Sequence, residues 1–414
     1  MRNSKGWIVT SAATGINLIL GVLYIWSIMS KALINEYKWN ATQASLPYTI
    51  CIVAFALVMV FAGRVQDLKG PRLSSTFGGI LLGVGLLLSG FVKEPFLMTL
   101  TFGILGGAGI GFCYAATTPP AVKWFPLEKK GLISGIVVSG VGFAAVYISP
   151  LTNALIANYG VAKSFIYIGI GALIIITILS QLLIDPPAEH IERMRSQVKK
   201  KNGENIQDKK QYSWREMLKT LSFYKLWIMY AFTSSAGLMI IGHLTVIAKN
   251  QAQWENGFYL VIFLAIFNTL GRIVAGIVSD KFGHTMTMRV IFSIQAINMV
   301  LFSLYVSPLT LAIGAALTGA SYGALFSVFP VAIADYYGTK NLGVNYGLLF
   351  TSWGVGGVIG PLLAGGIFDA TGSYNISYIV SAALLIIACL LTFIVKSPFN
   401  KKLNISESTK NVTN

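Results

Sequence analysis

Twelve apolar runs, separated by short polar loops, constrain this chain more than any other feature. An α-helix needs about 20 apolar residues to cross a bilayer, because a backbone in lipid must satisfy its own hydrogen bonds. Only 11% of the 414 residues are charged, whereas soluble proteins carry roughly 25%. We therefore predict an all-α membrane protein with twelve transmembrane helices, at residues 7–30, 43–63, 73–92, 96–119, 131–156, 162–184, 223–248, 257–279, 288–306, 309–334, 342–368 and 376–396.

The basic residues are distributed unevenly between the two sides of the predicted bundle. The net charge of +16 would suit a nucleic-acid-binding protein, but the lysines and arginines lie in short clusters between apolar runs. If both termini lie on one side, that side holds 25 of the 31 Lys and Arg residues and the opposite loops hold five. Because cytoplasmic segments are enriched in these residues, we expect a multi-pass protein of the cell membrane (inner or plasma membrane). Both termini would be cytoplasmic, with lipid and no nucleic acid as a partner.

A long polar stretch divides the twelve runs into six and six. We predict an N-terminal half at residues 1–184, a cytoplasmic linker at 185–222, a C-terminal half at 223–396 and a cytoplasmic tail at 397–414. Near the end of the linker, Ser213 and Glu216 have the spacing of a capping box. This spacing predicts a short helix at the membrane interface.

The two halves repeat one another. The pattern G-x-x-x-D-x-x-G follows the second run at residues 63–70 and the eighth run at residues 276–283, which is 213 residues later. Tyr114 in the fourth run and Tyr322 in the tenth run are related by a similar offset of 208. Duplicated six-helix units with a binding site at their interface are typical of secondary transporters. We therefore expect two pseudo-symmetric six-helix halves.

Arg272 is the only Lys or Arg that lies well inside a predicted transmembrane run. A charged side chain at mid-membrane costs about 2.5–3.5 kcal/mol even on the insertion scale, so it requires a partner. No carboxylate stands inside another run to provide one. We expect the partner to be an anionic substrate, since a guanidinium matches both oxygens of a carboxylate. The alternative is a structural arginine bound to backbone carbonyls.

The motif loops resemble the signature of the major facilitator superfamily. Three further stretches, at residues 21–27, 123–135 and 345–347, are similar to the oxalate/formate antiporter group and to the bacterial monocarboxylate (lactate) transporters near it. The resemblance covers the whole chain. It implies the major facilitator fold, alternating access, and Arg272 as the ligand of the substrate carboxylate.

Two positions depart from the relatives that this resemblance names. The oxalate exchanger has a second buried base, a lysine, at the position of Trp353, so one cation here would match a monoanion better than a dianion. Eukaryotic monocarboxylate cotransporters place an acid at the position of Asn268, which lies on the same helix face as Arg272 and cannot titrate. Proton coupling by that route is therefore unsupported.

Other side chains are weaker candidates for the substrate site. Tyr114 and Tyr322 could donate hydroxyl groups to a carboxylate from the two halves, or they could be core aromatics with satisfied hydroxyls. Asn268 could orient Arg272 or make an ordinary interhelical hydrogen bond. Trp353 and Tyr24 are candidates for the wall of the cavity.

Further polar residues suggest a role in conformational change. Asp67 and Arg72, with Asp280 and Lys281 in the second copy, are predicted gating residues, the two acids pairing with Arg or Lys and with helix termini across the interface of the halves. His243 is the only histidine in a membrane interior. It could carry a proton near neutral pH, or be hydrogen-bonded within the bundle.

These observations predict a secondary active transporter of small, lactate-like monocarboxylates that works by alternating access and proton-coupled symport. The alternative is an anion exchanger of the oxalate/formate type, since an unpaired Arg272 would hinder the return of the empty carrier. A non-transporting membrane sensor is a more distant alternative. No nucleotide-binding loop or catalytic residue set occurs in the sequence. We expect a monomer without a cofactor, whose partners are the carboxylate and protons, and no enzymatic activity.

Overall fold

The computed structural model describes residues 2–190, 211–254 and 257–398. All secondary-structure elements in these residues are helices. The N-terminal half begins with one long span that contains a short 3-10 segment, and its fourth span contains a π-helical segment. Its elements are α1 (Arg2–Leu20), η1 (Gly21–Ile25), α2 (Trp26–Tyr37), α3 (Ala41–Lys69), α4 (Pro71–Ser89), α5 (Pro95–Met98), η2 (Thr99–Gly106), α6 (Gly107–Lys123), η3 (Leu127–Lys129) and α7 (Lys130–Ser180).

The helix α7 contains two transmembrane spans rather than one. Its 51 residues are interrupted at Gly160, where φ is 76° and ψ is 172°. A positive φ of this kind is open to glycine at no steric cost. Eleven helices of the described chain are long and apolar enough to cross a membrane, and because α7 holds two spans the total is twelve. The predicted twelve-helix architecture is confirmed.

The C-terminal half repeats the six-span arrangement after a single helical turn. Ser213 caps that turn through the predicted capping box with Glu216, but the helix ends at Met217. The elements of this half are α9 (Trp214–Met217), α10 (Leu221–Ala252), α11 (Phe258–Phe282), α12 (His284–Leu301), η4 (Phe302–Leu304), α13 (Pro308–Tyr337), α14 (Leu342–Thr371) and α15 (Asn375–Ile394).

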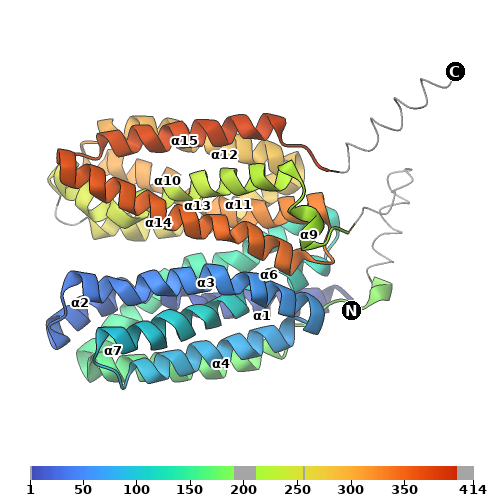
Figure 1. The fold of residues 1–414 in the computed structure, drawn as a ribbon, viewed down its shortest axis with the longest axis horizontal. Helices are drawn as coiled ribbons and strands as arrows, with labels where there is room; N and C mark the ends of the chain where they lie inside the picture. The colour runs from blue at the N-terminus through green and yellow to red at the C-terminus, as the bar shows by residue number, and fades with distance from the viewer. Residues whose placement is uncertain (1, 191–210, 255–256, 399–414) are drawn as a thin grey trace.

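The halves form two bundles that lie side by side (Figure 1). In that view, α3 of the lower bundle lies next to α14 of the upper one, and α7 also contacts α11. The loops of both G-x-x-x-D-x-x-G motifs, α9 and the start of α1 lie at one end of the molecule, on the right of Figure 1. We call this the motif end.

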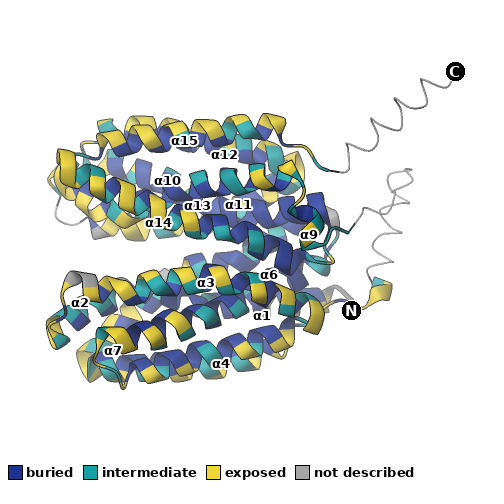
Figure 2. Cartoon of the chain, viewed as in Figure 1, coloured by how far each residue is buried: buried dark blue, intermediate teal, exposed yellow. Residues whose placement is uncertain are grey.

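The outer faces of the helices are apolar and exposed, whereas the faces between helices are buried (Figure 2). Phe91, Leu309 and Leu362 are 76%, 73% and 69% exposed. Apolar surface on this scale is not tolerated in water, because soluble monomers rarely expose large contiguous apolar patches. The surface is that of a multi-pass membrane protein.

Candidate functional site

Arg272 lies inside α11 with only 1% of its surface exposed. Its Nε donates a hydrogen bond to Asn268 Oδ1 at 2.9 Å, and its Nη1 donates to the backbone carbonyl of Val138 in α7. The guanidinium also lies 4.5 Å from the centre of the Phe326 ring in α13. No acidic side chain pairs with Arg272 within the described residues. Its charge is therefore held by a carbonyl, an amide and an aromatic ring, contributed by both halves.

Glycines on α7 allow this contact between the halves. A Cβ atom on Gly135 would lie 2.4 Å from the Arg272 carbonyl oxygen, and one on Gly142 would lie 3.3 Å from Arg272 Nε. Small residues permit helix backbones in membranes to approach closely. The backbone of α7 can therefore come within hydrogen-bonding reach of the buried guanidinium.

Aromatic side chains from five helices gather beside Arg272, around the fully buried Phe350 of α14. Their ring centres lie 4.9–6.3 Å from that of Phe350, in the range of favourable aromatic pairs. We call this set the aromatic cluster, and it comprises Phe350 with Phe55, Tyr114, Tyr230, Phe326, Tyr346 and Trp353. The first two neighbours belong to the N-terminal half and the rest to the C-terminal half.

Four of the predicted substrate residues lie in or against this cluster. Tyr114 and Trp353 belong to it, and Tyr322 packs on Phe326 with ring centres 5.2 Å apart. The Trp353 indole Nε1 donates a hydrogen bond to the Tyr322 hydroxyl at 2.8 Å. Asn268 reaches the cluster through Arg272.

Tyr24 is the predicted substrate residue whose side chain lies outside the described part of the structure; its backbone belongs to η1.

Sequence reasoning missed several members of the site. Val138 contributes only a backbone carbonyl, which leaves no trace in the residue types. Phe326 follows Tyr322 by one helical turn, so the shared face could have indicated it. Tyr230 and Phe350 are two aromatic residues among many in apolar runs, and nothing in their spacing separates them from core residues.

The two motif aspartates bind helix N-termini across the interface between the halves. The Asp67 carboxylate accepts hydrogen bonds from Gly343 N and Val344 N, at 3.1 and 2.9 Å, in the first turn of α14. The Asp280 carboxylate accepts hydrogen bonds from Gly131 N and Leu132 N, at 2.6 and 2.8 Å, in the first turn of α7. A carboxylate at a helix N-terminus is stabilised by the unpaired N–H groups and the helix dipole. Each half thus contributes one aspartate and one receiving helix.

The two predicted basic gating residues are placed differently. Arg72 is exposed in the first turn of α4, and Lys281 is exposed with its Nζ 5.2 Å from the centre of the Phe282 ring. Within the described residues, neither forms an ion pair with Asp67 or Asp280. In the described part of the chain, an ion pair between the halves is instead made by Lys130 Nζ of α7 and Asp335 Oδ1 of α13, 3.6 Å apart.

Asp335 also contacts a histidine of its own half. Its Oδ2 lies 3.4 Å from His284 Nδ1, at the start of α12. Lys130, Asp335 and His284 thus form a group of ionisable side chains on the α7–α11 side of the motif end.

His243 has a partner for each ring nitrogen. Nε2 lies 3.0 Å from the Pro361 carbonyl oxygen, and Nδ1 lies 3.0 Å from the Tyr374 hydroxyl. A carbonyl oxygen can only accept, so Nε2 carries the hydrogen and Nδ1 accepts from the tyrosine. This arrangement satisfies a neutral histidine.

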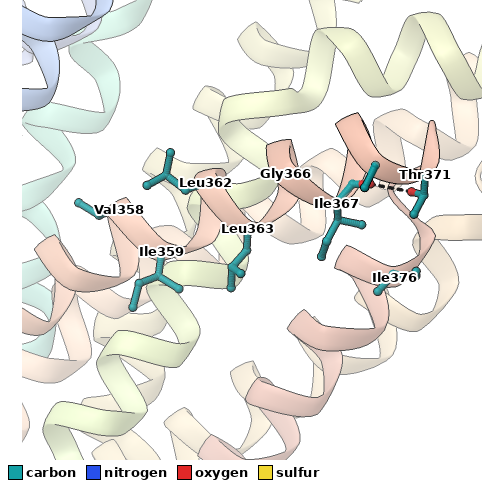
Figure 3. A pocket seen from close by; sticks show the side chains of 9 residues that line it. Val358, Ile359, Leu362, Leu363, Gly366, Ile367, Thr371 and Ile376 are labelled. Carbon is teal, nitrogen blue, oxygen red and sulfur yellow. Dashed lines mark hydrogen bonds between the residues drawn. The ribbon is translucent and has the colours of Figure 1, made fainter.

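A separate hollow of about 540 Å³ lies on α14 and the start of α15 (Figure 3). Its lining is almost entirely aliphatic, from Val358 to Ile376, and Thr371 Oγ1 is bonded to the Ile367 carbonyl at 2.7 Å. It contains no charged group, so it does not suit a carboxylate. Among the described residues, no three His, Cys, Asp or Glu side chains are grouped so as to hold a metal ion.

Comparison with known proteins places this architecture in a family. The sequence matches the Major Facilitator Superfamily over residues 8–309 and 291–413. It is 26% identical to the oxalate:formate antiporter of Oxalobacter formigenes over 403 residues, covering 95% of this chain and 93% of that protein. It is 24% identical to monocarboxylate transporter 13 of Rattus norvegicus over 389 residues, covering 92% and 86% of the two chains.

A solved structure also shares the fold. The proton:xylose symporter XylE superimposes with a TM-score of 0.75 at 12% identity, covering 96% of this chain and 97% of that one. At this identity the likeness concerns the fold alone.

Proposed function

Because the chain belongs to the Major Facilitator Superfamily of membrane transporters, we propose that it is a secondary transporter of small, lactate-like monocarboxylates working by alternating access. The observation that carries the proposal is the buried Arg272, whose partners come from both halves and include no acid within the described residues. Relatives named as an oxalate:formate antiporter and a monocarboxylate transporter support the class of substrate.

A substrate carboxylate would replace one of the present partners of Arg272. Its oxygens would replace the Val138 carbonyl as the acceptor of the Arg272 hydrogen bond, and both could accept from the planar guanidinium. Charge-assisted hydrogen bonds are stronger than neutral ones. Binding would therefore replace the contact between α7 and the arginine by a contact between the arginine and the substrate.

The surroundings of Arg272 favour one negative charge and a small apolar body. Trp353 packs on Phe326, the ring that contacts the guanidinium, and the aromatic cluster contains no second base. A second carboxylate would be left without a cation in a region of low dielectric, at a large cost. We therefore favour monocarboxylates over oxalate.

The ligand-free contacts of Arg272 bear on the coupling mode. The expectation that an unpaired Arg272 hinders the empty carrier does not apply, because the arginine already has a carbonyl, an amide and a ring as partners. An empty carrier whose arginine keeps these neutral partners could reorient without an uncompensated charge, which favours net flux over obligatory exchange. We propose proton-coupled symport as the form of that flux. Exchange remains the second candidate, supported by the oxalate:formate antiporter relative.

We place the motif end in the cytoplasm of a cell-membrane protein, in accord with the basic loops. Both aspartate contacts would then close the cytoplasmic side in this structure. The carrier would release its substrate inward only after Asp67 and Asp280 leave their receiving helices.

Transport by purified protein in proteoliposomes tests the coupling. With symport, an acidic exterior drives net lactate uptake into empty vesicles, and a protonophore abolishes it. Uptake only into vesicles preloaded with a monocarboxylate would identify an exchanger. Absence of flux under both conditions would point to the sensor.

Arg272→Lys tests the binding site, with Arg289→Lys as the matched control. Arg289 lies near the α12–α15 contact, with its guanidinium over Phe393 and bonded to Thr392. An ammonium cannot form the two-pronged contact, so Arg272→Lys should weaken lactate binding by about a hundredfold or more, an effect of roughly 2.7 kcal/mol. Equal lactate affinity in the two variants would refute the assignment.

A further inference from the structure

The start of α14 contacts both the opposite half and the linker. Gly343 N and Val344 N, in its first turn, donate hydrogen bonds to the Asp67 carboxylate of the N-terminal half. Directly before the helix, the Asn341 side-chain amide donates to the Tyr212 carbonyl at 3.0 Å, at the end of the linker. One helix end is thus held by two segments that lie far apart in the sequence.

The linker segment before α9 is fixed on the end of α13 and the start of α14. We call residues 211–213 the strap. Tyr212 N donates to the Tyr337 carbonyl at 2.9 Å, and the rings of the two tyrosines meet edge to face, 5.6 Å apart. The Asn345 amide is a second donor to the Tyr212 carbonyl, at 3.2 Å. These contacts determine the position of the carbonyl that accepts from Asn341.

Asn341 occupies the N-cap position of α14 without capping the helix. Its carbonyl accepts the first helical hydrogen bond, from Asn345 N at 3.0 Å, but its side chain makes no capping bond. An N-cap asparagine ordinarily accepts from the second or third helical N–H group, which here are Gly343 N and Val344 N. These are the groups that bind Asp67. Asn341 and Asp67 are therefore alternative caps for the same two N–H groups.

The corresponding end of α7 has no such alternative. Asp280 binds Gly131 N and Leu132 N, and the N-cap residue of α7 is Lys129. A lysine side chain has donors only, so it cannot accept from those N–H groups. Of the two helix ends that receive a motif aspartate, only that of α14 carries a competitor for its aspartate.

We propose that Asn341 is a second cap of α14, which replaces Asp67 when the motif end opens. This inference rests on the alternating access of the proposed function, but on no particular substrate. In the closed arrangement, the strap holds the Asn341 amide and leaves both N–H groups to Asp67. When Asp67 leaves with its half, Asn341 turns from the Tyr212 carbonyl to its own helix. The N–H groups then keep an acceptor, which lowers the cost of opening.

The exchange of caps couples the linker to the opening of the motif end. The Asn341 side chain bonds either the strap or the helix, so release of the strap favours the open arrangement. The linker therefore takes part in the conformational change, besides joining the two halves.

The ratio of open to closed motif ends in the full-length protein tests the exchange. Spin labels at the exposed Leu68 and Lys281 lie in opposite halves and outside the strap, so their separation gives this ratio without any substrate. Asn341→Ser keeps a hydroxyl that can cap, whereas the side chain of Asn341→Ala can neither cap nor donate. We expect the ratio to be about fivefold higher in the serine variant, the factor that corresponds to one N-cap.

Tyr212→Pro tests the link to the strap. Proline lacks the N–H group that donates to the Tyr337 carbonyl, so the strap no longer fixes Asn341. We expect the ratio to rise several-fold in the wild-type background and to stay within about twofold in the Asn341→Ala background, because the strap acts through Asn341.

Ser307→Ala is the matched control for the loss of a cap. Ser307 caps α13 through Thr310 N, at the opposite end of the molecule from the motif end. This variant should lower the stability of the protein, as the loss of any cap does, and leave the ratio of open to closed motif ends unchanged.

Two results would overturn the proposal. Equal ratios in Asn341→Ser and Asn341→Ala, including a single closed distance in both, would show that no second cap forms. An equal gain from Tyr212→Pro with and without Asn341→Ala would show that the strap does not act through this residue. Neither measurement involves a carboxylate, so failure of monocarboxylate binding would refute the proposed substrate and leave the exchange of caps standing.

Discussion

Two crossings between the halves, α3 with α14 and α7 with α11, share one backbone design but differ in chemistry. At each crossing an aspartate binds the first turn of the partner helix, and a glycine of that helix, Gly347 or Gly135, packs against a carbonyl of the other. The 213-residue offset between Asp67 and Asp280 relates Arg272 to Met59, whose carbonyl contacts Gly347 as the Arg272 carbonyl contacts Gly135.

The same offset relates the polar Asn268 to Phe55. One crossing therefore carries an amide and a guanidinium, and the other carries a phenyl ring and a thioether at the corresponding positions. The duplicated scaffold therefore carries a polar pair of side chains at one crossing and an apolar pair at the other. Under the proposed function, the polar pair would face the carboxylate of the transported acid and the apolar pair its hydrocarbon end.

The largest effect should come from adding a charge to the apolar crossing. Met59→Arg places a guanidinium beside Phe55, without the amide that supports Arg272, and should destabilise the protein by about 2.5–3.5 kcal/mol. Adding Phe55→Asn should recover part of this loss, because hydrogen bonds to charged groups contribute about 1.5–3 kcal/mol. The check is the unfolding midpoint in detergent, with Met59→Leu as the control. An arginine variant as stable as the leucine variant would mean that the crossings do not differ in their capacity for charge.

Alanine at the paired glycines should separate the crossings next. A Cβ on Gly135 would lie 2.4 Å from the Arg272 carbonyl oxygen, and one on Gly347 would lie 2.8 Å from the Met59 carbonyl oxygen. Overpacking of this kind costs about 1–3 kcal/mol, and we expect the larger loss at Gly135. Gly366→Ala, which faces open space, is the control. Thermal unfolding measures all three, and a greater loss at Gly347 would contradict the geometry.

Neutralising the aspartates should have a smaller effect, and an unequal one. Asp67→Asn and Asp280→Asn each remove a charge from a helix N-terminus, an interaction that contributes about 0.3–1 kcal/mol. Lys130 and Asp335 also tie the halves together on the α7–α11 side, so the motif end should open more readily in Asp67→Asn.

Spin labels at the exposed Leu68 and Lys340 can report this opening as a longer distance between the halves. Adding Asp335→Asn to Asp280→Asn removes the ion pair as well. The motif end of this double variant should then open about as readily as that of Asp67→Asn. If Asp280→Asn alone opens the motif end further than Asp67→Asn, the ion pair does not strengthen its crossing.

The smallest effect should follow His243→Gln, which lies outside both crossings. Both ring nitrogens of His243 already have hydrogen-bond partners, the Pro361 carbonyl and the Tyr374 hydroxyl. At each pH between 5 and 8, we expect proton-driven lactate uptake by the variant to stay within about twofold of wild-type uptake. This is the range in which an unperturbed histidine changes its charge. A pH profile shifted by one unit or more would instead make His243 part of the coupling.

Much of the fold could be predicted from the sequence, because a membrane span is a local property. A run of about twenty apolar residues predicts a membrane helix whatever its neighbours are. Most of the twelve runs agree with the spans to within about four residues, but the first two spans extend further, to Tyr37 and Lys69. The contact between Asn268 and Arg272 was predictable for the same reason, since residues four apart share a helix face.

Helix termini across the interface were predicted as partners of the two aspartates, but the particular residues in distant segments could not be read in this way. The receiving groups of Asp67, Asp280 and Arg272 are backbone N–H and carbonyl groups, which every residue possesses. Which backbone groups act as partners depends on which helices cross and how closely they approach. The glycines that allow this close approach resemble the many other glycines of the chain. Basic partners for the aspartates were a reasonable expectation, but Arg72 and Lys281 lie on exposed faces instead.

The joint at Gly160 has a consequence for how the protein is made. Its two arms are connected by one residue rather than by a loop, so the fifth and sixth spans form a single helical hairpin. In the proposed topology, insertion of this hairpin would carry Lys163, near its tip, across the bilayer. We expect a residue that cannot adopt a positive φ at position 160 to hinder the pairing of the two arms while the N-terminal half is being assembled, before any transport occurs.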